Sequence, residues 1–221
     1  AINFVPAMIS QEKYFKKLNT EMPVLWIYYG LMIVMAIYNL LIFLSTRDRD
    51  YILYVMFIVS YIIFQMTLNG HAFQYLWPNA IWWANNSLPF FIVMSILFAG
   101  IFTTSVIDAK NSFPGLFRLM LILVILPAAI IAVLSLTIKY SIAIKLATAF
   151  IAIGAVTWYI GLIYAMIKGS RPARFHVLGW TGLILGIVLF ALKTFDILPL
   201  IFLTQWSLQI GSSLVVILLS L

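Results

Sequence analysis

The sequence places amide side chains inside long apolar runs, and these amides are its main candidates for binding a ligand. Gln65 and Asn69 are four residues apart, so they lie on one face of a helix. Gln205 and Gln209 repeat that spacing. Amides in hydrocarbon usually bond to a neighbouring helix, for on the order of 0.6 kcal/mol each. The alternative is that several of them, together with tryptophans, line a pocket for a small polar or amphipathic ligand. The candidate ligand-binding residues are Gln65, Asn69, Trp82, Asn85, Asn86, Lys193, Gln205 and Gln209.

Lys193 is the candidate that carries a charge. It precedes Asp196 by three residues, which makes the two side chains neighbours on a helix. A lysine in this position either extends its ammonium to the membrane surface or presents a charge at the mouth of a cavity. Both alternatives stay open for Lys193, whereas surface extension is favoured for Lys145. Asn39 lies deeper in its run and is expected to be structural.

Motifs for catalysis are missing from the sequence. It has no HExxH, no GxSxG and no glycine-rich phosphate loop. The absence of cysteine excludes disulfides, thiolate metal sites and a cysteine nucleophile. His71 and His176 are expected at opposite membrane faces, where they cannot share a metal. A retinal protein would need a lysine inside its last span, and there is none. We therefore expect no catalytic residue, no metal and no cofactor in this chain.

Composition indicates which elements hold these residues. Of 221 residues, 65% are hydrophobic and 9% are charged, whereas soluble domains have about 25% charged residues. The pattern predicts an all-α, polytopic membrane protein, because no ten-residue stretches alternate as in a membrane barrel. Seven runs are each long enough to cross about 30 Å of hydrocarbon. The predicted spans are about 23–45, 51–69, 84–107, 116–136, 141–167, 175–194 and 203–221.

The charged residues predict the orientation of the bundle. Lysines and arginines gather in the loops after the first, third and fifth spans, which the positive-inside rule places in the cytoplasm. The N-terminus is then outside, together with the aromatic stretch 73–83. Residues 1–22 are expected to be an extracytoplasmic linker, or the end of a missing sensor domain. The net charge of +7 is scattered among loops, so it favours contact with the lipid bilayer over binding of nucleic acid.

Several short motifs resemble one bacterial receptor family. They are Tyr28-Tyr29-Gly30, Tyr38-Asn39, Arg47-Asp48-Arg49-Asp50-Tyr51 with Tyr54, Asn69-Gly70, Leu76-Trp77-Pro78, Leu192-Lys193, Leu198-Pro199, Gln209-Ile210-Gly211-Ser212 and Leu219-Ser220-Leu221. In this order they resemble the seven-transmembrane receptors with diverse intracellular signalling modules, over about residues 28–221. The resemblance implies a periplasmic, carbohydrate-binding-like sensor domain before the bundle. It also implies a cytoplasmic output after it, such as a histidine kinase or a diguanylate cyclase.

The main hypothesis is therefore the membrane domain of a signalling receptor in the bacterial inner membrane. A stimulus would shift the seventh span and reposition an output module within a homodimer, which requires two helix arrangements of similar energy. The first alternative is a transporter or channel, and a continuous polar path would support it. The second alternative is a non-signalling subunit of a membrane complex.

Overall fold

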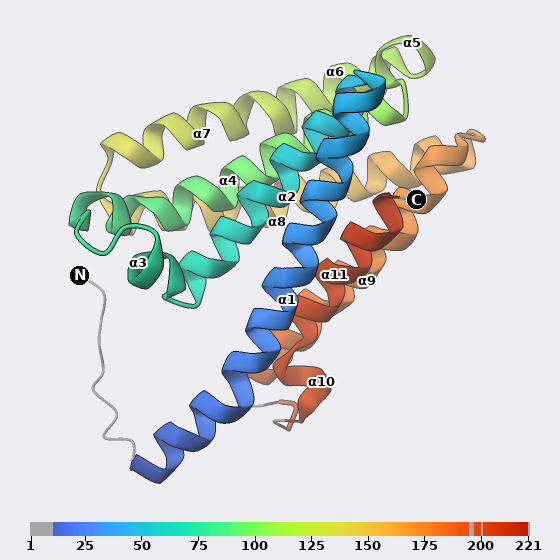
Figure 1. The fold of residues 1–221 in the computed structure, drawn as a ribbon. Helices are drawn as coiled ribbons and strands as arrows, with labels where there is room; N and C mark the ends of the chain where they lie inside the picture. The colour runs from blue at the N-terminus through green and yellow to red at the C-terminus, as the bar shows by residue number, and fades with distance from the viewer. Residues whose placement is uncertain (1–10, 195–196, 200, 221) are drawn as a thin grey trace.

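The computed structural model describes residues 11–194, 197–199 and 201–220, and the regular elements in these ranges are all helices (Figure 1). This confirms the predicted all-α membrane bundle. The helices are α1 (Gln11–Thr46), α2 (Arg49–Leu68), α3 (His71–Tyr75), α4 (Ile81–Val106), α5 (Ala109–Ser112), α6 (Pro114–Met120), the π-helix η1 (Leu121–Ile125), α7 (Leu126–Thr137), α8 (Tyr140–Ile167), α9 (Arg171–Thr194), α10 (Phe202–Gln205) and α11 (Ser207–Leu219).

Six segments among the described residues are long and apolar enough to cross a membrane. They are residues 19–46 of α1, α2, α4, the continuous run α6–η1–α7, α8 and residues 171–190 of α9. Each agrees with a predicted span. The seventh predicted span, 203–221, is helical in its described residues as well, and Trp206 divides it into the short α10 and the 13-residue α11.

The first helix is longer than the apolar run that predicted it. It begins at Gln11 and continues through Pro23 to Thr46. Residues 11–22, expected to be part of a linker, are thus continuous with the membrane span.

A charged corner joins α1 to α2. Arg47 adopts a positive φ of 58°, and the carboxylate of Asp48 accepts a hydrogen bond from the backbone N–H of Asp50 at 3.0 Å. This is an N-cap, which satisfies one of the free N–H groups at the start of α2. The hydroxyl of Ser105, at the end of α4, donates to the carboxylate of Asp50. Local capping and one tertiary bond therefore hold α1, α2 and α4 together at this end of the bundle.

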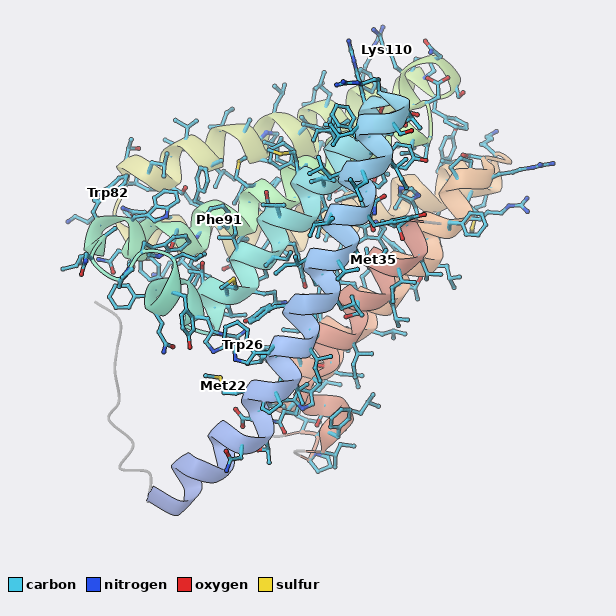
Figure 2. All side chains as sticks on the ribbon, viewed as in Figure 1. Met22, Trp26, Met35, Trp82, Phe91 and Lys110 are labelled. Carbon is cyan, nitrogen blue, oxygen red and sulfur yellow. The ribbon has the colours of Figure 1, made fainter. Side chains whose placement is uncertain are left out.

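The bundle has two chemically different ends, which Figure 2 marks with Lys110 and Trp82. We call the end with the corner 47–50, Lys110 and the turn 168–171 the charged end. The opposite end, with α3, α10 and the segment 77–83, we call the aromatic end. Figure 1 shows the helices fanning out from the charged end, so that α3 and α10 lie apart.

Within this fan α2 packs chiefly against α4, and α9 packs chiefly against α11. The α9–α11 contact is close because it is made through glycines. A Cβ on Gly211 would lie 2.8 Å from the carbonyl oxygen of Gly182 and 3.0 Å from the Cα of Leu183. Small residues let membrane helices approach at this distance. Helix α1 contacts both α2 and α11, and α8 contacts both α4 and α9. The last helix is thus held against α9 along its length.

Candidate functional site

The first group of predicted site residues lies where α2 meets α3 at the aromatic end. The amide of Asn69 donates to the hydroxyl of Tyr29 at 3.0 Å and to the backbone carbonyl of Gln65 at 2.8 Å. The side-chain amide of Gln65 is fully buried and donates to the hydroxyl of Tyr61 at 3.0 Å, while its carbonyl oxygen has no hydrogen-bond partner among the described residues. Gln65 and Asn69 are therefore neighbours, and their side-chain N–H groups donate mainly to other groups of the protein.

His71 completes this group from the start of α3. Its Nδ1 lies 3.2 Å from the Tyr29 hydroxyl, and its ring stacks on Trp26 with centroids 5.7 Å apart. Tyr75 contacts both rings. Figure 2 shows Trp26 on the part of α1 that approaches α3. Burial of the imidazole lowers the pKa of His71 below its ordinary value of 6.5, because the charged form loses its hydration. The ring joins α3 to α1.

A second group lies at the start of α4, at the aromatic end. Trp82 is exposed, Asn85 is exposed and Asn86 is buried with its amide donating to the backbone carbonyl of Trp82 at 3.0 Å. The three residues line a shallow groove together with the turn between α7 and α8, residues 137–141. The groove lies between α4 and this turn, and it is separate from the group around His71.

The remaining candidates lie near α10 and the end of α9. The side-chain amide of Gln205 donates to the carboxylate of Glu21 on α1 at 3.2 Å. Gln209 is partly buried, and its carbonyl oxygen has no partner among the described residues. The ammonium of Lys193 lies 5.3 Å from the centroid of the Phe190 ring. Its predicted neighbour Asp196 lies outside the described residues.

The eight candidates therefore occupy three separate places at the aromatic end, and ligand binding by them stays a prediction. Asn39, expected to be structural, is fully buried and donates to the backbone carbonyl of Met35 at 2.9 Å. Among the described residues no three histidine, aspartate or glutamate side chains are close enough to hold a metal ion.

An apolar cavity in the described part of the bundle was not anticipated from the sequence. It has a volume of about 320 Å³ and lies between α2 and α4 on one side and α9 and α11 on the other, with α8 closing it. On α2 it is lined by residues 57, 61, 64 and 68, a spacing of four, three and four that marks one helix face. This stripe of Phe57, Tyr61, Phe64 and Leu68 was the available signal.

A sequence-family model described as 7TM diverse intracellular signalling matches residues 21–221. The chain belongs to this family. No curated protein and no solved structure matches it. Together with the apolar helices, the match identifies a multi-pass membrane domain of a signalling receptor.

Two tyrosines among the residues that carried the resemblance lie in the interior of this 7TM signalling domain. The hydroxyl of Tyr28 lies 3.0 Å from that of Ser212 on α11. The hydroxyl of Tyr54 donates to the backbone carbonyl of Val216, also on α11, and its ring stacks on Phe102 with centroids 4.8 Å apart. Thus two tyrosines, one on α1 and one on α2, hydrogen-bond to the last helix. These bonds make up a polar attachment of α11 to the first two helices.

Proposed function

We propose that this 7TM signalling domain relays a stimulus from the outer side of a bacterial inner membrane to a cytoplasmic output module, and that α11 is the element that moves. The observation that carries the proposal is the attachment of α11 by two different sets of contacts. Glycines hold it closely against α9, and Tyr28 and Tyr54 hold it to α1 and α2 through single hydrogen bonds.

The two sets of contacts differ in how they resist motion. The backbones of α9 and α11 are in direct contact at Gly182 and Gly211, with no free space between them. We therefore expect α9 and α11 to move as one rigid body. A single hydrogen bond in a membrane is worth on the order of 0.6 kcal/mol, so the bonds from Tyr28 and Tyr54 can be exchanged at little cost. A rigid helix pair with exchangeable polar attachments suits a two-state relay.

The direction of the relay follows from the distribution of charge. The basic residues Arg47, Arg49, Lys110, Lys168 and Arg171 belong to the charged end, so the positive-inside rule supports a cytoplasmic position for it. The helix α11 runs toward that end. We propose that the output module follows it, that any catalysis belongs to that module and that the receptor works as a homodimer. The lining of the apolar cavity gives no support to a pore for polar solutes.

Single cysteines test this orientation, because the sequence has none of its own. Lys110→Cys at the charged end and Asn79→Cys at the aromatic end are both at exposed positions. In intact spheroplasts, a membrane-impermeant maleimide is expected to label the Asn79 variant, and to label the Lys110 variant only after permeabilisation. The reverse pattern would contradict the proposed direction of signalling. Crosslinking of single-cysteine variants in the native membrane tests the homodimer.

A further inference from the structure

The apolar cavity between α2–α4 and α9–α11 has walls suited to hydrocarbon. It is lined by side chains from five helices, which are Phe57, Tyr61, Phe64, Leu68, Ile92, Ser95, Ile96, Ile151, Ala155, Trp158, Tyr159, Leu162, Trp180, Leu183, Ile184, Ile187, Phe190 and Leu208. Few polar atoms lie in these walls. Tyr159 bonds to Thr181 at 2.6 Å and Ser95 to the carbonyl of Ile92 at 2.7 Å, whereas the indole N–H of Trp180 has no partner among the described residues. A ligand with several polar groups would lose its hydration here and gain few partners, which is unfavourable.

The length of the cavity matches one leaflet of a bilayer. On α2 its lining extends from Phe57 to Leu68, and on α9 from Trp180 to Phe190. Each stretch covers about 15 Å at 1.5 Å per residue, which is roughly half of the 30 Å hydrocarbon thickness. Both stretches end at the aromatic end of the bundle. The cavity therefore extends from near the middle of the membrane to one surface, over the depth that a single acyl chain occupies.

The end of the cavity at the membrane surface is open and carries a positive charge. Leu68 and Ile187, which line it there, are each 45% exposed on the membrane-facing surface. Phe190 lines the same end, and the ammonium of Lys193 lies 5.3 Å from its ring centroid. A lysine beside the mouth of an apolar cavity attracts a single anionic headgroup.

From this combination we infer that the cavity binds a long-chain fatty acid, with its chain between α2–α4 and α9–α11 and its carboxylate at Lys193. One chain fills a cavity of this length, and one carboxylate matches one ammonium. If the proposed relay is correct, occupancy would also set the separation between α2 and the α9–α11 pair. Binding of the fatty acid does not depend on the relay, so an experiment can contradict either proposal without contradicting the other.

Photo-crosslinking of the purified full chain with diazirine-labelled palmitic acid tests the inference. Peptide mapping is expected to find the label on residues 57–68 and 180–190, and an excess of unlabelled palmitic acid should suppress it. Methyl palmitate lacks the carboxylate and should compete at least about tenfold less well. Label spread over lipid-facing positions such as Ile33 and Ile160 would overturn the inference. Stronger labelling by a diazirine-acyl phosphatidylglycerol than by the fatty acid would also overturn it.

Two neighbouring substitutions on α9 provide a matched comparison. Ile184 lines the cavity, whereas the next residue, Leu185, is 58% exposed to the bilayer and does not. Ile184→Trp fills the cavity and should lower labelling about tenfold, while Leu185→Trp should leave it unchanged. Lys193→Gln should weaken binding of palmitate but not of its methyl ester, and Lys193→Arg should restore it. Equal labelling of the two tryptophan variants would contradict binding of the fatty acid in this cavity. If Ile184→Trp does not fold, the peptide mapping of the wild-type protein tests the same inference.

Discussion

The hydroxyl of Tyr54 on α2 donates a hydrogen bond to the backbone carbonyl of Val216 on α11. Val216 is buried in the part of α11 that lies near the charged end of the bundle. The bond therefore joins α2 to the backbone of α11 there. A shift of α11 relative to α2 must break this bond, which makes Tyr54 a sensor of the position of the last helix.

Replacement of Tyr54 by phenylalanine removes the hydroxyl and keeps the ring that stacks on Phe102. The buried carbonyl of Val216 then lacks its partner, and we expect the domain to lose about 1–2 kcal/mol of stability. Thermal unfolding in detergent measures this loss. Tyr38→Phe is the matched control, because Tyr38 is 51% exposed on the membrane-facing surface of α1. A melting temperature of Tyr54→Phe equal to that of the control would show that the bond does not stabilise the domain.

Gly211→Ala should separate α9 from α11. The added methyl group would meet the backbone of Gly182 and Leu183, which cannot move aside as a flexible side chain can. We expect a loss of about 1–3 kcal/mol, as for other overpacked interiors. Gly30→Ala is the control, because a Cβ there meets nothing within 4 Å. It should be neutral or slightly stabilising, since alanine favours helix over glycine by up to about 1 kcal/mol. Similar effects of the two substitutions would argue against close α9–α11 packing.

The bond between Tyr28 and Ser212 can be measured by a double-mutant cycle. Tyr28→Phe, Ser212→Ala and the double variant should give a coupling free energy of about 0.6 kcal/mol, and no more than about 1.7. Equilibrium unfolding of the four proteins provides the values. Strict additivity of the two single effects would mean that the contact at 3.0 Å is energetically neutral, and that α1 is not attached to α11 by it.

The pH dependence of stability should reflect His71. Its pKa is lowered in the folded state by burial, so below about pH 6.5 the unfolded chain binds more protons than the folded one. Stability from this group is therefore complete above pH 6.5 and is lost as the pH falls. Protonated Nδ1 also can no longer accept from Tyr29.

Melting temperatures at pH 7.5 and 5.5 test this expectation, with His71→Gln as the comparison. Between pH 7.5 and pH 5.5 the melting temperature of His71→Gln should fall by less than that of the wild type. His176 is unchanged in both proteins, so the difference between them isolates His71. An equal loss in wild type and variant would exclude His71 as the source.

The sequence predicted the membrane spans well because their physical cause is local. In a membrane, an apolar run such as α2 or α8 forms all of its backbone hydrogen bonds within its own helix, so it is helical whichever helices pack against it. The division of the last span at Trp206 was not predicted in this way, because polar residues such as Thr204, Gln205 and Ser207 also occur inside continuous membrane helices. Hydropathy also gave no indication that α1 begins as early as Gln11, since residues 11–22 are polar.

The candidate site was harder to predict because it depends on which helices become neighbours. The amides Gln65 and Gln205 are polar and therefore conspicuous, yet the structure pairs them with Tyr61 and Glu21 inside the protein. The cavity is formed instead by aromatic and aliphatic side chains that look like ordinary lipid-facing residues. The i,i+4,i+7 stripe starting at Phe57 was visible, but only the packing of α2 opposite α9 turns it into a cavity wall.

The claim that α11 moves and carries the signal is tested most directly by output from a reporter. A diguanylate cyclase joined after residue 221 in the bacterial membrane reports the position of the last helix as cyclic dinucleotide per molecule of folded protein. A bias of about 1 kcal/mol changes a two-state ratio about fivefold. The account predicts a change of this order for Tyr54→Phe and Gly211→Ala, and none for Tyr38→Phe and Gly30→Ala. Equal output from all four variants and the wild type would contradict the relay through α11.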